Sequence, residues 1–342
     1  MRDGTELDVE QTAVLSRAEG CLLGQCAGDA LGSMVEFQSV EHIRTFPGGL
    51  HTISGSPVFG TIAGQPTDDS EMALALAHTL VQHGWDPELV ANAYANWLES
   101  GPFDVGNTVG QALQAAAHAR KQGKSLSQAA MSQGNKHSEA NGALMRQSPL
   151  AVWGYALPPE QLDEYVRADT RLTHFNPVCE DASSAFIAAL AAVIREGLDG
   201  KGAYRVACLW DEKHGSSPTV SAALRRASTE APDYLTHVGH VVVALQNAFY
   251  MVLHAPSVEE GVVRTVLGGG DTDTNAAIAG ALLGAVYGRE QVPAQWQQVL
   301  TDCSPKLGAP GVSKPRPEEY WPNNLVGVTG LAYSLIKSGT NS

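Results

Sequence analysis

The sequence has few basic residues, few aromatic side chains and no paired cysteine pattern. It carries 22 Lys and Arg against 36 Asp and Glu, a net charge of −14 over 342 residues. This balance disfavours nucleic acid and anionic membranes as partners, because both need clustered positive charge. The five cysteines are odd in number and scattered, which indicates neither a disulfide framework nor a zinc pattern. We therefore expect a reducing, cytoplasmic location.

Long apolar runs and alternating strand patterns are scarce as well. The longest uninterrupted run of apolar residues and glycine covers residues 276–286, short of the ~18 residues needed to cross a bilayer. Residues 1–11 are polar and acidic and lack the apolar segment of a secretory signal. We expect a flexible acidic arm over residues 1–12 and one domain over residues 13–342. Ala- and Leu-rich helical patterns recur along the chain, so the predicted fold class is all-α. The predicted helical stretches are residues 13–34, 71–80, 87–100, 105–121, 158–170, 177–194, 236–254, 257–266, 272–288 and 326–338.

Glycine, by contrast, is plentiful and regularly spaced in two predicted helices, one over about residues 13–34 and one after residue 272. Residues four apart lie near one face of a helix. Each glycine costs a helix about 1 kcal/mol relative to alanine, so the repetition needs a physical reason. We expect two closely packed central helices that bring their polar ends into one site. The repeating glycines are Gly20, Gly24, Gly28 and Gly32 in the first helix and Gly280, Gly284 and Gly288 in the second.

Two clusters of hydroxyl and carboxylate side chains stand at predicted helix starts about 200 residues apart. One is the run 67–70, Thr-Asp-Asp-Ser, and the other is the run 271–274, Asp-Thr-Asp-Thr, which follows three glycines. A helix cap needs only one such side chain. Several oxygen ligands in each cluster suit a hard divalent cation such as Mg²⁺ or Mn²⁺. The two clusters therefore predict a shared metal site.

Taken with four further stretches in the same order, these clusters resemble the ADP-ribosylglycohydrolase family. The matching pieces are Gly28–Gly32 with Glu36-Phe37, Thr67–Ser70, Phe103–Thr108, Asn141–Arg146 with Pro149, Thr173-His174 with Pro177, and Gly269–Thr274. The resemblance covers about residues 18 to 300. It implies a single-domain, all-α orthogonal helical bundle with two Mg²⁺ or Mn²⁺ ions in a cleft.

The resemblance also implies roles for individual residues. The implied metal ligands are Thr67, Asp68, Asp69, Asp271, Asp273 and Thr274. The implied catalytic residues are Glu36, Asp104 and Asp69, and the implied substrate-binding residues are Asn141, Gly142, His174 and Gly270. Ser70, Asn176 and Ala140 depart from the residues usual in the family, and these departures concern substrate contacts more than the metal site. Asp29, inside the first glycine-lined helix, fits a structural carboxylate that satisfies backbone groups near the site.

The function that the resemblance implies is a metal-dependent hydrolase that removes ADP-ribose from modified protein side chains. Arginine is the expected acceptor, so the enzyme would reverse an ADP-ribosyltransferase. Serine-linked ADP-ribose and O-acetyl-ADP-ribose stay open as substrates. A different class of function also stays open: an immunity protein that binds and neutralises an ADP-ribosyltransferase toxin, with the acidic arm as one binding element. A haloacid-dehalogenase-type phosphatase is disfavoured, because glycines rather than a strand precede the Asp-Thr-Asp-Thr run.

Overall fold

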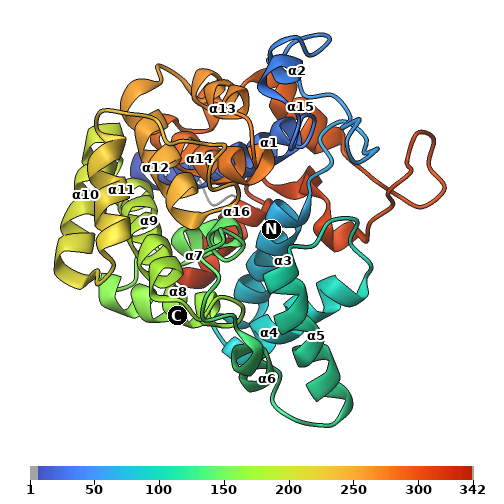
Figure 1. Ribbon diagram of the computed structural model, residues 1–342, viewed down its shortest axis with the longest axis vertical. Helices are drawn as coiled ribbons and strands as arrows, with labels where there is room; N and C mark the ends of the chain where they lie inside the picture. Colours follow the sequence, from blue (N-terminus) through green and yellow to red (C-terminus); the bar gives the residue numbers. More distant parts are fainter. Residues whose placement is uncertain (1–6, 341–342) are drawn as a thin grey trace.

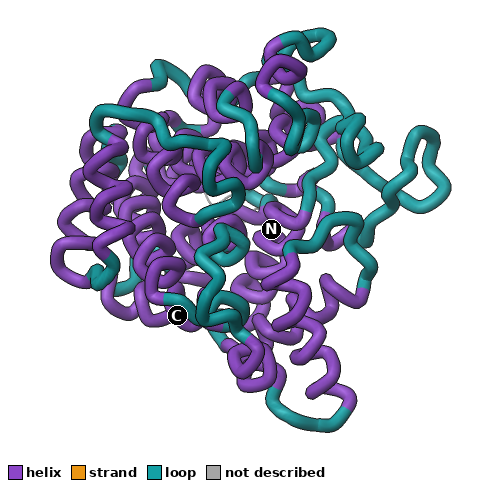
Figure 2. The backbone as a smooth tube through the Cα atoms, viewed as in Figure 1, coloured by secondary structure: helices purple, strands orange, loops and turns teal. Residues whose placement is uncertain are grey.

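Helices make up the regular secondary structure of residues 7–340, the part of the chain that the computed structural model describes (Figure 2). Within that range, extended backbone pairs only in an isolated antiparallel bridge between Ala140 and His240. The predicted all-α, single-domain fold is confirmed.

The helices fall into longer and shorter elements. The longer ones are α1 (Val9–Gly32), α3 (Asp68–His83), α4 (Pro87–Glu99), α5 (Asn107–Lys121), α6 (Leu126–Gln133), α8 (Pro159–Arg171), α9 (Pro177–Glu196), α10 (Gly200–His214), α11 (Pro218–Ala227), α12 (Val241–His254), α13 (Val258–Leu267), α14 (Thr272–Tyr287), α15 (Ala294–Asp302) and α16 (Leu331–Gly339). The shorter ones are α2 (Val40–Arg44), α7 (Ser148–Trp153) and the 3₁₀ turns η1 (Leu144–Arg146), η2 (Arg289–Gln291), η3 (Glu318–Tyr320) and η4 (Pro322–Asn324).

Helices α1 and α14 pack against each other in the middle of the bundle, with α9–α12 on one side and α3–α6 on the other (Figure 1). A Cβ atom at Gly24 would lie 2.0 Å from the carbonyl oxygen of Gly280. That distance is far inside van der Waals contact, so the two backbones touch and only glycine fits. The predicted pair of glycine-lined helices is confirmed. At one end of the pair, the Thr272 hydroxyl donates to the carbonyl of Gly32 at 2.7 Å.

Helix α1 begins at Val9 rather than near residue 13, because Asp8 caps it. The carboxylate of Asp8 accepts the Gln11 backbone N–H at 2.8 Å, and the Gln11 side chain accepts the Asp8 N–H at 3.1 Å. This reciprocal capping box satisfies two helix N–H groups that would otherwise lack partners. Residues 9–12 of the predicted flexible arm therefore form the first turn of α1. Residues 1–6 of that arm lie outside the described residues.

The helix predicted over residues 236–254 begins later, at Val241. Asp233 explains the difference, because its Oδ1 accepts the backbone N–H groups of Leu235 and Thr236 at 2.9 and 3.1 Å. Such an Asx turn competes with helix formation. Gly239 adds a φ of +77°, which a right-handed helix excludes. The segment before α12 is therefore a loop.

Helix α9 is long and apolar enough to cross a membrane by composition, with a mean hydropathy of 1.5. In the fold, however, 83% of its apolar window is buried inside the protein. Its Phe186 packs edge-on against Phe249 of α12, with ring centroids 6.3 Å apart. Helix α9 is therefore a core helix of the bundle.

A buried ion pair ties the C-terminal part of the chain to α3. Arg316 donates to both carboxylate oxygens of Glu71 at 2.7 to 3.0 Å, and Nε1 of Trp97 donates to the same carboxylate at 2.8 Å. The Arg316 and Glu71 side chains are only 2% and 1% exposed. Glu71 lies in the first turn of α3, so this pair fixes the end of the helix from which Asp68 and Asp69 project.

Candidate active site

The N-terminal ends of α3 and α14 meet at one cleft with a volume of about 440 Å³. Asp68 and Asp69 belong to the first turn of α3, Asp271 directly precedes α14, and Asp273 lies in the first turn of α14. Other walls come from the segment after α1 and from the loops before α5 and η1. The residues singled out in the sequence that line this cleft are Glu36, Asp68, Asp69, Asp104, Asn141, Gly142, His174, Asp271, Asp273 and Thr274.

Three buried carboxylates form the tightest group in the cleft. One carboxylate oxygen from each of Glu36, Asp271 and Asp273 lies within 4.8 Å of the others. The three side chains come from two segments, because Glu36 follows α1 whereas both aspartates belong to the start of α14. Oxygen atoms at this spacing could hold one hard divalent cation. The sequence singled out Glu36 as a catalytic residue, and the structure adds it to the groups that could bind a metal.

The glycines before Asp271 shape the turn that carries the cleft side chains. Gly269 and Gly270 have φ angles of +79° and +74°, a region that L-residues with a Cβ atom rarely adopt. The Gly270 carbonyl accepts the backbone N–H of Phe37 at 3.0 Å, which places Glu36 beside the α14 start. Gly270 itself is not among the residues found to line the cleft, so its described contact is with backbone.

On the α3 side, the fully buried Asp29 holds the acidic turn in place. Its carboxylate accepts the backbone N–H groups of Thr67 and Ser70, both at 3.0 Å, and lies 3.0 Å from the Thr67 hydroxyl. These contacts agree with the structural role expected for Asp29. Thr67 is fully buried and does not itself line the cleft, and its hydroxyl lies 3.0 Å from Oδ2 of Asp69. Oδ1 of Asp69 is buried and has no hydrogen-bond partner within residues 7–340.

Burial and mutual repulsion raise the pKa values of carboxyl groups in the cleft. Burial, with the charges of Asp104 and Asp271 second, raises the pKa of Glu36 to about 8. Burial followed by the charge of Asp104 raises the pKa of Asp68 well above its usual range, and burial followed by the charge of Glu36 does the same to the pKa of Asp273. Like charges this close disfavour the ionised form. A bound cation would reverse that penalty.

The loop before η1 contacts the acidic group directly. The side-chain amide of Asn141 donates to Oδ2 of Asp271 at 2.7 Å. The backbone N–H of Asn141 donates to the Gly239 carbonyl at 3.0 Å, which ties this loop to the segment before α12. Gly142 lies next to the His174 ring, because a Cβ atom there would be 3.3 Å from Cε1 of the imidazole. The family resemblance implied Asn141, Gly142 and His174 as substrate-binding residues. No sequence pattern predicted the hydrogen bond from Asn141 to Asp271.

His174 is buried in the cleft wall, and a hydrogen-bond chain from Arg146 through Thr173 reaches its ring. Nη1 of Arg146 donates to Oγ1 of Thr173 at 3.0 Å, and Oγ1 lies 2.8 Å from Nδ1 of His174. Because a guanidinium can only donate, the hydroxyl accepts from Arg146 and gives its own proton to the hydrogen bond with Nδ1. This arrangement favours the tautomer that carries the ring proton on Nε2.

Nε2 of His174 is available to a ligand. It is buried without a hydrogen-bond partner in the described part of the chain, and the residue lines the cleft. Burial, with the nearby charge of Arg146 second, lowers the pKa of His174 to about 3, so the ring is neutral. His174 thus offers the cleft a neutral N–H donor, which suits an oxygen acceptor on a ligand.

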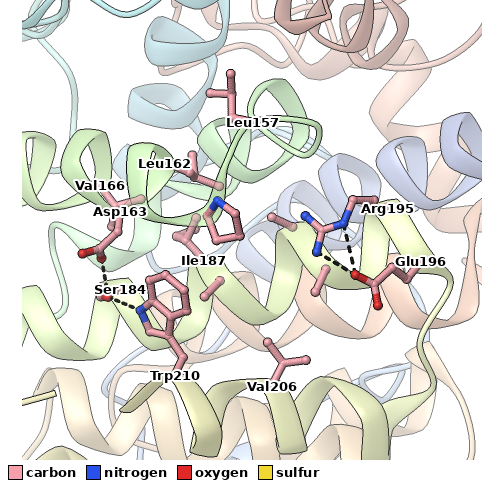
Figure 3. Close-up of a pocket in the computed structure, with 14 residues that line it drawn as sticks. Leu157, Leu162, Asp163, Val166, Ser184, Ile187, Arg195, Glu196, Val206 and Trp210 are labelled. Atoms are coloured by element: carbon pink, nitrogen blue, oxygen red, sulfur yellow. Dashed lines mark hydrogen bonds and ion pairs between the residues drawn. The ribbon is translucent and has the colours of Figure 1, made fainter. Parts of the chain in front are cut away.

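A second cavity, between α8, α9 and α10, has a different character (Figure 3). It measures about 110 Å³ and is lined largely by aliphatic side chains such as Leu162 and Ile187. Its polar groups already have partners, since Nε1 of Trp210 donates to Oγ of Ser184 at 2.7 Å and Ser184 donates to Asp163. This cavity offers no group of free carboxylates, so the acidic cleft is the candidate active site.

The donor set of the acidic cleft fits a hard divalent cation. The converging side chains are carboxylates and hydroxyls, the ligands that Mg²⁺ and Mn²⁺ prefer. Oδ1 of Asp69 has a free lone pair, and Oγ1 of Thr274 lies 3.4 Å from Oδ2 of Asp69, which joins the α14 turn to the α3 turn. Crowded carboxylates with raised pKa values are the arrangement that a cation would stabilise.

Comparisons with known proteins identify the class of this site. The family model described as "ADP-ribosylglycohydrolase" matches residues 10–314. The "ADP-ribosyl-[dinitrogen reductase] glycohydrolase" of Rhodospirillum rubrum is 31% identical over 291 residues, which cover 84% of this chain and 91% of that protein. The "ADP-ribosylarginine hydrolase Tri1" of Pseudomonas putida (strain GB-1) is 28% identical over 303 residues, with 82% and 73% covered. A solved structure titled "ADP-ribosylglycohydrolase-related protein complex" superposes with a TM-score of 0.75 at 25% identity and covers 96% of this chain and 99% of that one.

The fold and the buried carboxylate cleft therefore belong to an all-α hydrolase. The chain is a member of the ADP-ribosylglycohydrolase family, and it is an enzyme of that family.

Proposed function

We propose that the acidic cleft hydrolyses the bond that joins ADP-ribose to a modified protein side chain, with arginine as the acceptor. The observation that carries this proposal is the group of three carboxylates, Glu36, Asp271 and Asp273, with oxygens within 4.8 Å of one another at the floor of the cleft. Asp104 and the N–H donor of His174 line the same space. The partner is accordingly an ADP-ribosylated protein.

Two Mg²⁺ or Mn²⁺ ions are the cofactors of this proposal. The residues that would hold them are Thr67, Asp68, Asp69, Asp271, Asp273 and Thr274, with Glu36 close to the same oxygens. When bound, such ions lower the pKa of a water molecule and hold the ribose hydroxyls.

The chain's own carboxyl groups perform the proton transfers. A water oxygen forms a bond to the anomeric carbon while the bond from that carbon to the guanidine nitrogen breaks, through a transition state with oxocarbenium character. Glu36 accepts the proton that leaves the water, and Asp104 gives a proton to the departing nitrogen. Burial raises the pKa of Asp104, which favours its protonated form and suits this donor role. Asp69, with Oδ1 free, positions the water.

Neutral donors bind the rest of the substrate. The pyrophosphate of ADP-ribose is anionic while the protein carries a net charge of −14, so the overall charge of the protein does not attract it. Nε2 of His174 supplies a hydrogen bond without adding charge, and Asn141 and Gly142 lie in the same cleft wall. In this arrangement the pyrophosphate contacts neutral hydrogen-bond donors, and the bond to be broken lies next to the carboxylates.

Arginine is preferred as the acceptor because relatives at 28% and 24% identity are named as ADP-ribosylarginine hydrolases. Serine-linked ADP-ribose and O-acetyl-ADP-ribose are the alternatives, since the carboxylate group serves departure of an oxygen as well as of a nitrogen. A cytoplasmic location fits the five cysteines, which are all free thiols.

The decisive experiment measures release of ADP-ribose from an arginine-ADP-ribosylated protein. Release should require Mg²⁺ or Mn²⁺, stop with EDTA and be lost in Asp271→Ala. Asp302→Ala, an exposed acidic position on α15, is the matched control and should keep full activity. Release from a serine-linked or O-acetyl conjugate instead would change the acceptor. Failure on every conjugate would refute the hydrolase proposal.

The alternative of an immunity protein that binds an ADP-ribosyltransferase toxin stays a prediction. Its acidic arm lies partly outside the described residues, and from Val9 onward that stretch is part of α1. Tight binding of a transferase by a variant without hydrolase activity, such as Asp271→Ala, would support it.

A further inference from the structure

Three large apolar side chains stand exposed around the Gly269-Gly270 turn. Phe37, Leu235 and Val238 are 65%, 58% and 43% exposed, and we call them the apolar rim. A Cβ atom at Gly269 would lie 3.5 Å from Cδ2 of Leu235, and one at Gly270 would lie 3.6 Å from Cγ2 of Val238. The backbone N–H of Phe37 donates to the Gly270 carbonyl at 3.0 Å. Two distant segments thus place these side chains around one turn.

The apolar rim borders the acidic cleft. Phe37 lines the cleft and also reaches solvent. The segment that carries Leu235 and Val238 continues to Gly239, where a Cβ atom would lie 3.4 Å from Oδ2 of Asp271. Hydrogen bonds from this segment to the Asn141 loop fix it to the site. The rim is therefore built on the same backbone as the carboxylate group.

Leu235 and Val238 lie next to the acidic cleft rather than in its wall. Neither belongs to the lining of the cleft as the described residues define it. Single exposed apolar side chains are ordinary on protein surfaces, but a group of them at the edge of a site marks a contact surface. The carboxylates of the cleft are buried, so an ADP-ribose moiety enters the cleft while the polypeptide attached to it stays at the mouth.

We propose that the apolar rim binds apolar side chains next to the modified residue on the protein substrate. This inference rests on the proposed hydrolase function, since the substrate's own covalent bond brings its polypeptide to the mouth. Burial of the rim against leucine or isoleucine side chains removes apolar surface from water on both partners. The enzyme therefore prefers modified residues with apolar neighbours.

The test compares two ADP-ribosylated peptides of equal length with the free conjugate, ADP-ribosyl-arginine. In one peptide leucines flank the modified arginine, and in the other serines do. The wild-type enzyme should cleave the leucine-flanked peptide with a kcat/KM about tenfold higher, the size expected for burial of a few apolar groups. The double variant Leu235→Ser/Val238→Ser should bring that ratio near one and leave kcat/KM for the free conjugate unchanged.

A matched control is Leu209→Ser on α10, an exposed leucine at 55% that lies away from the cleft. It should keep the wild-type preference. An unchanged preference in the rim double variant would overturn the proposal, and so would an equal loss on the free conjugate, because the rim would then contact the nucleotide. Dissociation constants of both peptides are measured alongside. If the wild type cleaves no conjugate, the hydrolase proposal fails. The apolar rim is then judged by the dissociation constants alone. Tighter binding of the leucine-flanked peptide supports the rim proposal, and equal binding of the two peptides overturns it.

Discussion

The side-chain amide of Asn141 donates a 2.7 Å hydrogen bond to Oδ2 of Asp271. Asp271 is one of three carboxylates within 4.8 Å of one another, and Asn141 is 6% exposed. The bond leaves the other oxygen of Asp271 free and fixes the orientation of the carboxylate. A partner of this kind tunes a ligand without touching the metal.

Asn141→Ala should lower both activity and apparent affinity for Mn²⁺ by about 10- to 100-fold, the usual cost of losing an outer-shell partner of a metal ligand. Steady-state kinetics with ADP-ribosyl-arginine and a Mn²⁺ titration measure the two effects. Asn96→Ala, a substitution on α4 outside the cleft, serves as the control. Wild-type Mn²⁺ affinity in Asn141→Ala would show that the amide does not orient Asp271.

The metal-free protein should become more stable as pH falls from about 8 to about 5. The pKa of Glu36 is raised to about 8 and that of Asp29 to about 6, mainly by burial. A raised pKa means that the folded state holds a proton that the unfolded state has released. Stability therefore rises as pH falls through the folded pKa, by at most about 1.4 kcal/mol per pH unit for each such proton. The lowered pKa of His174 opposes this rise below about pH 6.5, so the rise is steepest between pH 8 and pH 6.5.

Urea unfolding in EDTA at several pH values measures this slope. Glu36→Gln should flatten the part nearest pH 8, because the amide does not titrate. Added Mn²⁺ should stabilise the protein more at pH 8 than at pH 5, since the cation competes with protons for the same oxygens. A metal-free protein that loses stability over this range would contradict the prediction.

Thr173→Val should disturb the tautomer of His174. The valine removes the hydroxyl that donates to Nδ1, so nothing in the described contacts of the ring holds the proton on Nε2. We expect about a tenfold loss in kcat/KM, the worth of one hydrogen bond of about 1.4 kcal/mol. Imidazole nitrogen NMR should show the Nε2–H tautomer in the wild type and in Thr173→Ser. An Nδ1–H tautomer in the wild type would refute the assignment.

Gly24→Ala should destabilise the fold by about 3 kcal/mol or more, since the added methyl group meets a carbonyl oxygen at 2.0 Å and neither backbone can yield without repacking. Gly110→Ala on α5 is the control, because a Cβ atom there meets only a methyl group of Val105 at 3.2 Å. Helix propensity favours alanine by about 1 kcal/mol at such a position. Thermal unfolding of both variants measures the change in stability. An equal change in Gly24→Ala and Gly110→Ala would mean that α1 and α14 separate easily.

Local chemistry in the sequence was enough to predict the central helices and the aspartates at the starts of α3 and α14. Glu36 and Asp104 were instead implied by the family resemblance. The glycine spacing indicated close helix contact, and the structure confirms it at Gly24 and Gly280. Predicted site residues from α3, α14 and the intervening loops line one cleft, although their individual roles stay predictions. The glycine repeat and the acidic clusters are each patterns among residues close in sequence, so they could be recognised without the structure.

Several features that have no recognisable motif in the sequence were not predicted. The pair of Arg316 with Glu71 joins residues with no common motif. Helices α10 and α11 were missed because each buries only a few residues among many polar ones. The buried residues are Ala203, Ala207 and Asp211 in α10 and Val220, Ala223, Leu224 and Ala227 in α11. The loop before α12 was predicted to be helical because its Asx turn at Asp233 has no periodicity to reveal it.

The glycine spacing has a consequence for how α1 and α14 align. Gly20 faces Gly284 and Gly24 faces Gly280, with Cβ positions 2.1 and 2.0 Å from the opposite carbonyl oxygens. A slide of one helical turn would set Gly20 against Gly280 and Gly24 against Ala276, which are again small residues. The four-residue repeat of small residues therefore lets α1 and α14 pack in a similar way in the observed alignment and in one shifted by a helical turn.

The ends of the two helices select between those registers. At one end Oγ of Ser16 donates to Glu290 at 2.6 Å, and at the other Oγ1 of Thr272 donates to the Gly32 carbonyl at 2.7 Å. A one-turn slide of about 6 Å would break both bonds. Thr272 stands between the two aspartates that begin α14, so the short segment that supplies the cleft's carboxylates also locks the register of the central helix pair.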